Sequence, residues 1–112
     1  MDKEQKGYRF VKCTVDTQPE GAGAWRKARI PWRVLRQLAH AYQEIEGIGD
    51  DAFWEDVYRK LAELMPEWTL VDSEGNPLDN PSSNPLIFDD LDDAELRWIF
   101  TEVMGGRAAP ST

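Results

Sequence analysis

Carboxylates are the side chains of this sequence with the greatest capacity for chemistry, and they gather in two short stretches. One stretch comprises Asp89, Asp90, Asp92 and Asp93, and the other spans residues 72–79 around Gly75. Clustered carboxylates can bind divalent cations or act as a general acid and base. Neither stretch has the spacing of a calcium-binding loop, and aspartates that precede a helix are explained by capping and by the helix dipole. We therefore expect no metal site and no cofactor.

Nucleophilic catalysis and zinc binding need partner residues that this sequence does not supply. The only histidine, His40, falls within an expected helix, and the only cysteine is Cys13. A catalytic nucleophile needs an adjacent base, and a zinc site needs several His or Cys ligands. The glycines at positions 21 and 23 match neither type of phosphate-binding loop. The sequence therefore predicts a protein that is not an enzyme, and its single cysteine favours a cytoplasmic location.

Aromatic and basic side chains are interleaved near the N-terminus, a pattern typical of proteins that bind single-stranded nucleic acids. They occur in three stretches, residues 8–10, 25–29 and 32–36. Alternation along a strand would place Trp25 and Lys27 on one face and Arg26 on the other, which gives no aromatic platform. We expect a solvated hairpin whose basic side chains point outward. A nucleic-acid contact through this hairpin is kept as an alternative function.

The charge distribution is uneven along the 112 residues, whose formal net charge is −8. Residues 1–42 hold nine Lys and Arg against four Asp and Glu, whereas the remainder holds four against seventeen. Net acidity disfavours binding to nucleic acid, because phosphate neutralisation supplies most of such affinity. The asymmetry indicates either solvated faces or a docking surface for an oppositely charged partner. A small acidic protein that inhibits a host enzyme by mimicking nucleic acid is therefore a second alternative.

The hydrophobic pattern predicts an α+β fold, with a small N-terminal β-hairpin or sheet and three helices. Strands are expected at residues 8–15 and 24–30, and a short strand at residues 68–71 could join them. Helices are expected at residues 32–46, at residues 51–65 behind an Asp50 cap, and from a cap at Asp90 or Asp92 to about residue 104. Residues 79–85 are expected to form a surface loop. We expect one domain at residues 7–106, with disordered ends at residues 1–6 and 107–112, and no membrane-spanning segment.

Five tryptophans are more than this small core needs, which suggests that some of them contact a partner. Trp98 is two residues from both Leu96 and Phe100, so helical phase places it away from the main apolar stripe of the last helix. Leu91, Ala94 and Trp98 would form a second, narrower apolar set. Together with Trp32, Leu91 and Trp98 could line a groove for a partner helix. Trp98 could equally complete the core, and both interpretations stay open.

Residues 68–78 have the pattern W-x-L-x-D-x-x-G-x-P-L, formed by Trp68, Leu70, Asp72, Gly75, Pro77 and Leu78. This segment resembles one found in small proteins from the tail-assembly region of long-tailed bacteriophages and prophages, which are described as tail assembly chaperones. The order of elements over about residues 24–104 is also similar. In physical terms Trp68 and Leu70 alternate toward a core, Asp72 opens a turn, and Gly75 supplies a positive φ.

This resemblance implies a non-enzymatic protein of phage or prophage tail morphogenesis. Such a chaperone binds another tail protein, for example the long helical tape measure, and keeps it soluble in the cytoplasm of the bacterial host cell. It implies no membrane partner. The oligomeric state does not follow from the sequence.

Overall fold

A three-stranded antiparallel sheet forms one layer of the protein, as seen in a computed structural model that describes residues 7–43 and 50–105. The strands are β1 (Tyr8–Lys12), β2 (Gly23–Lys27) and β3 (Glu67–Trp68), in the order β1-β2-β3. Phe10 pairs with Trp25, and Ala24 pairs with Trp68. The expected third strand therefore does join the hairpin, and the α+β fold is confirmed.

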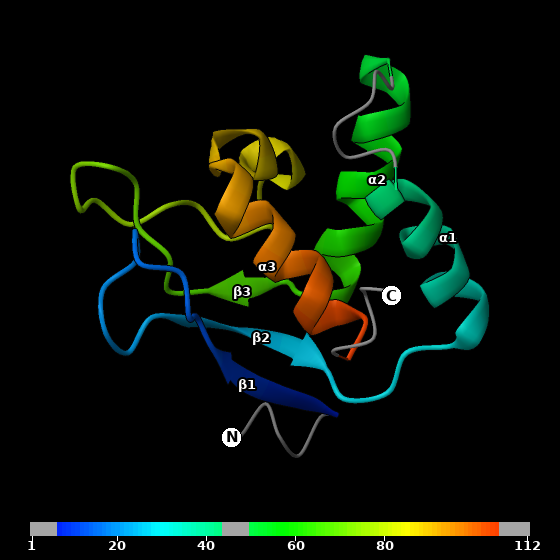
Figure 1. Cartoon of the computed structure of the whole chain (residues 1–112), viewed down its shortest axis with the longest axis horizontal. Helices are drawn as coiled ribbons and strands as arrows, with labels where there is room; N and C mark the ends of the chain where they lie inside the picture. The colour runs from blue at the N-terminus through cyan, green and yellow to red at the C-terminus, as the bar shows by residue number, and fades with distance from the viewer. Residues whose placement is uncertain (1–6, 44–49, 106–112) are drawn as a thin grey trace.

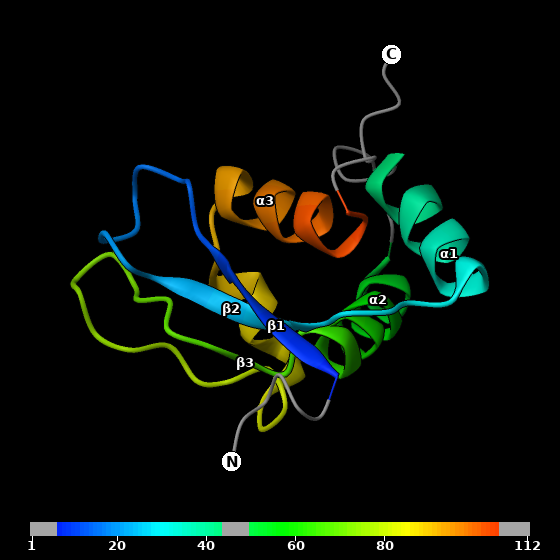
Figure 2. The same cartoon turned by 90° about the horizontal axis from the view of Figure 1, so that it is seen from below.

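In the described ranges, four helical elements lie on one side of this sheet (Figure 1). They are α1 (Trp32–Gln43), α2 (Asp51–Leu64), the 3₁₀ helix η2 (Pro85–Asp90) and α3 (Asp93–Val103). The view from below shows α1 and α2 together at one end of the sheet, with α3 running beside the strands (Figure 2). The core lies between the sheet and the helices, and its fully buried side chains include Leu38, Leu61, Leu70, Phe88, Ile99 and Phe100.

Side-chain caps fix where α2 and α3 begin. The Asp50 carboxylate accepts a hydrogen bond from the Phe53 amide at 2.8 Å, as expected for the cap of α2. Asp92, rather than Asp90, caps α3, and it forms a reciprocal capping box with Glu95. Because these bonds satisfy amides that have no partner within the helix, they account for aspartates that could otherwise suggest a metal site.

The turn within residues 68–78 folds as the sequence predicts, but the expected extent of the strand, residues 68–71, is wrong, because β3 ends at Trp68. Trp68 and Leu70 are buried, while Asp72 Oδ1 accepts hydrogen bonds from the amides of Glu74 and Asn76, both at 2.9 Å. Gly75 has a φ of +85°, a conformation that other residues rarely adopt. The motif therefore has a structural explanation, since each of these residues shapes a turn or fills the core.

A buried polar network joins this segment to the rest of the fold. The side-chain amide of Gln18 donates to the Val71 carbonyl at 2.9 Å and to Glu95 at 2.6 Å, and its oxygen accepts from the Val71 amide. Thr17 also donates to Glu95, at 2.7 Å. The turn before β2, the 68–78 segment and the start of α3 are thereby held together.

Several expected boundaries are wrong. Both N-terminal strands are shorter than predicted, since they end at residues 12 and 27 instead of 15 and 30. The expected loop at residues 79–85 is confirmed as irregular chain up to residue 84, but a 3₁₀ helix begins at Pro85, where the sequence predicts only a return to the core. The first helix is described to Gln43, and its expected last residues, like both expected disordered ends, lie outside the described residues.

Candidate functional site

The first helix carries apolar side chains on two of its sides. Leu38 and Ala41 are fully buried in the core. Trp32, Leu35 and Ala39 follow a second line with spacings of three and four residues, and such a line forms one continuous stripe on a helix. Trp32 is 67% exposed, more than any other large hydrophobic side chain in the described ranges. Exposing an indole ring of this size to water is unfavourable, so Trp32 is a strong candidate for an interaction residue.

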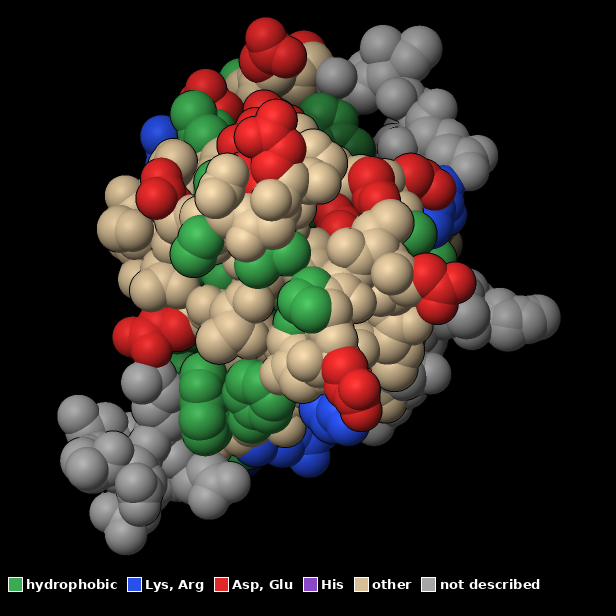
Figure 3. Space-filling view, turned by 90° about the vertical axis from the view of Figure 1, so that its left-hand side faces the viewer, with side chains coloured by type: hydrophobic (Ala, Val, Ile, Leu, Met, Phe, Trp, Pro, Cys, Tyr) green, Lys and Arg blue, Asp and Glu red, His purple; other side chains and the backbone are tan. Residues whose placement is uncertain are grey.

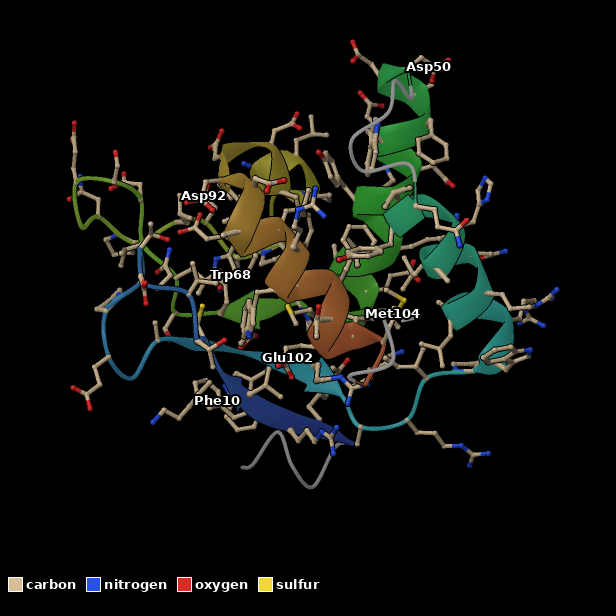
Figure 4. The ribbon with its side chains drawn as sticks, in the orientation of Figure 1. Phe10, Asp50, Trp68, Asp92, Glu102 and Met104 are labelled. Carbon is tan, nitrogen blue, oxygen red and sulfur yellow. The ribbon has the colours of Figure 1, made fainter. Side chains whose placement is uncertain are left out.

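A largely apolar pocket of about 490 Å³ lies against this stripe. Trp32, Leu35, Ala39 and Met104 form its apolar walls, and Arg36, His40 and Gln43 complete it. Met104 follows α3 directly and lies between the end of that helix and α1 (Figure 4). A methionine at such a position can adapt its shape to different apolar ligands. We call this feature the Trp32 pocket.

A second pocket, of about 330 Å³, adjoins the first because Leu35 and Met104 line both. Arg9, Arg26 and Arg29 also line it, and we call it the arginine pocket. We had expected the basic side chains of the hairpin to point outward, and for Arg26 this is wrong: its side chain is only 5% exposed. The sheet face that holds Ala24 and Arg26 is the face that the helices cover.

One hydrogen bond and the charges of Arg9 and Glu102 shape the environment of Arg26 within the described residues. Its Nη2 donates to the carbonyl of Val103 at 3.2 Å, near the C-terminal end of α3, whereas its Nε has no hydrogen-bond partner among the residues that the structure describes. Burial lowers the pKa of the Arg26 guanidinium, and the charge of Arg9 lowers it further, while Glu102 acts in the opposite direction. Arg26 remains a cation at neutral pH, because an arginine does not lose its proton in a protein.

The structure does not bring the three predicted groove residues together. Trp98 is 6% exposed and belongs to the core, and Leu91 is half-buried against that core. The stripe of α3 is wider than predicted: Glu95, Trp98, Ile99 and Val103 are all buried. Trp98 follows Glu95 by three residues and so lies on the same side of the helix. Of the three, only Trp32 lines one of the four pockets compared within the described residues.

No protein-family model, curated protein or solved structure matches this chain. The inferences below about its function therefore rest on its residues and their geometry. None of the helices in the described ranges is both long and apolar enough to cross a membrane.

The acidic clusters serve the fold. Asp92 caps α3, Asp93 pairs with Arg97 at 3.0 Å, and Asp72 closes the turn at Gly75. Among the residues described, no group of three or more His, Cys, Asp and Glu side chains could hold a metal ion. On the face shown in Figure 3 the carboxylates form separate groups rather than a row, so that face does not resemble the phosphate spacing of a nucleic acid.

A third pocket combines acidic and aromatic side chains. Asp51, Glu55 and Asp89 line it together with Trp54 and Tyr58. Tyr58 donates a hydrogen bond to Asp89 at 2.6 Å. Burial and this bond raise the pKa of the Tyr58 hydroxyl. The tyrosine is thus held as a neutral donor, which stabilises the contact between α2 and η2.

Sequence reasoning missed Leu35 and Met104 as site residues. We had assigned Leu35 to the core stripe of its helix, and Met104 had no assigned role. The three- and four-residue spacing from Trp32 through Leu35 to Ala39 was the available signal for the second stripe. No sequence signal could show that Met104 meets this stripe, because the two segments are distant along the chain.

Proposed function

We propose that this chain is a non-enzymatic binding module of phage or prophage tail morphogenesis, which binds another tail protein in the cytoplasm of the bacterial host. The observation that carries the proposal is the highly exposed Trp32 beside a pocket lined by Leu35, Ala39 and Met104. The resemblance of residues 68–78 to tail assembly chaperones supports the choice of partner.

The dimensions and chemistry of the Trp32 pocket suit an apolar side chain from a partner helix. Helices dock into grooves through anchors spaced three or four residues apart, and a pocket of about 490 Å³ has room for one or two such anchors. Trp32 would cover the anchor from one side and Met104 from another. Arg36 and His40 at the pocket would favour acidic or neutral residues beside the anchor.

A long tail protein that is helical and apolar would aggregate before it is assembled, because its apolar stripes are exposed to water. A small, strongly charged protein bound to such a stripe would cover the stripe and add net charge, which opposes aggregation. The net charge of −8 fits this role. Neither covering the apolar stripe nor adding net charge requires catalysis.

Co-expression with a long helical tail protein, such as a phage tape-measure protein, tests the proposal. We expect a greater soluble fraction of that protein when this chain is present, and a complex that survives size-exclusion chromatography. Trp32→Ala should abolish the gain in solubility. Leu86→Ala is the matched control, since Leu86 is 46% exposed and does not line the Trp32 pocket. Equal solubility with and without this chain would refute the proposal.

A further inference from the structure

The arginine pocket concentrates positive charge at one place in an acidic protein. Arg9 comes from β1, Arg26 from β2, and Arg29 from the segment that leads into α1. The C-terminal end of α3 completes the pocket. Within residues 7–43 and 50–105, neither Arg9 nor Arg29 forms an ion pair with a carboxylate.

Arg26 is the least expected of the three, because a buried cation is costly unless hydrogen bonds and opposite charge compensate it. A guanidinium has five N–H donors. The Val103 carbonyl accepts from Nη2, and Nε has no partner. Glu102 is the carboxylate whose charge acts on Arg26, yet no ion pair joins the two in the described part of the chain. Among the described residues that line the pocket there are three arginines and no carboxylate, so the lining carries a net positive charge.

The position of the arginine pocket beside the Trp32 pocket indicates which kind of ligand it binds. The arginine pocket and the Trp32 pocket share Leu35 and Met104, so one bound segment could occupy both. A nucleic acid would bring many charges toward a protein of net charge −8, whereas a largely apolar peptide segment would bring only a few. Guanidinium groups also match carboxylates well, because two parallel N–H donors meet two oxygens.

We propose that the arginine pocket binds carboxylate side chains that lie beside the apolar anchor of the partner segment. The partner is thereby specified as an amphipathic segment in which Asp or Glu residues adjoin the apolar anchor. The identity of the partner rests on the proposed function, but carboxylate binding by the three arginines does not. The proposed function and the carboxylate binding can therefore be refuted independently of each other.

Titration with a capped tetraglutamate peptide tests the anion site without any tail protein. The side-chain Nε–H resonance of Arg26, followed by ¹⁵N NMR, should shift and saturate as the peptide is added. The double variant Arg9→Gln/Arg29→Gln should bind the peptide at least about tenfold more weakly, because hydrogen bonds to charged groups are lost. Arg26 is kept, because its burial and its bond to α3 make it part of the fold.

The control is the double variant Arg33→Gln/Arg59→Gln, which removes the same charge from exposed arginines outside both pockets. It should change the affinity by less than about twofold at equal salt, because neither arginine lines the arginine pocket and solvent screens exposed charges. The absence of saturation, or equal weakening in both double variants, would overturn the proposal. A single-stranded oligonucleotide that bound more tightly than the peptide, through the same arginines, would overturn the assignment to carboxylates. Peptide binding without any effect on the tail protein would instead refute the proposed function alone.

Discussion

Replacing Trp98 measures how much the core depends on the side chain that sequence reasoning placed at a surface groove. Trp98 is 6% exposed, so Trp98→Ala removes nearly all of a buried indole ring. Burial of roughly 200 Å² at about 25 cal/mol per Å² corresponds to about 5 kcal/mol. Among the described residues, the indole Nε1 of Trp98 has no hydrogen-bond partner. Removing this buried N–H therefore removes a desolvation penalty of about 1–2 kcal/mol. We expect a net loss of about 3 kcal/mol in the free energy of unfolding.

Urea denaturation followed by circular dichroism would measure this loss, and in a domain of this size it corresponds to a decrease in Tm of roughly 10–15 °C. Trp98→Phe keeps an aromatic ring and removes the unpaired N–H, so it should cost less than about 1.5 kcal/mol. Trp32→Ala is the comparison at an exposed site, and its free energy of unfolding should stay within about 0.5 kcal/mol of the parent value. A loss below about 1 kcal/mol for Trp98→Ala would show that the ring is not part of the core.

Three further predictions concern local features of the fold. Gly23→Ala should cost about 2 kcal/mol or more in thermal denaturation, because the added Cβ would lie 2.3 Å from a backbone oxygen of β1. Asp92→Ala should cost about 1–2 kcal/mol in the same assay, since α3 loses its capping box with Glu95. The raised pKa of Tyr58 means that the unfolded chain loses this proton first. Stability should therefore be unaffected by Tyr58 below about pH 10 and should fall as the pH rises further, an effect that Tyr58→Phe removes.

Local signals in the sequence predicted the parts of the fold that depend on neighbouring residues. Asp50 caps α2 and Gly75 adopts a positive φ because each is determined by a few adjacent backbone groups. The 3₁₀ helix that begins at Pro85 was missed, since the only expectation there was that apolar side chains return to the core. Ile87 and Phe88 do so, whereas Leu86 stays exposed.

The environments of Arg26 and Trp98 could not be predicted locally, because they depend on which face of an element is covered. Strand alternation correctly separated Arg26 from Trp25, but it gave no indication that helices cover the side that holds Arg26. For the candidate site, the tryptophan surplus suggested Trp32 as a groove residue, and Trp32 is exposed. Met104 meets Trp32 only through the tertiary fold, so it was beyond sequence reasoning.

The central claim is that Trp32 anchors a tail protein at the surface of α1, and the affinity of that complex is its most direct test. Isothermal titration calorimetry with the co-purified tail protein would compare the parent chain, Trp32→Ala and the exposed control Leu86→Ala. Loss of an interface tryptophan costs about 2 kcal/mol or more, so Trp32→Ala should raise the Kd at least about 30-fold. Leu86→Ala should leave the Kd within about twofold of the parent. A folded Trp32→Ala protein that binds with the parent's Kd would contradict the claim.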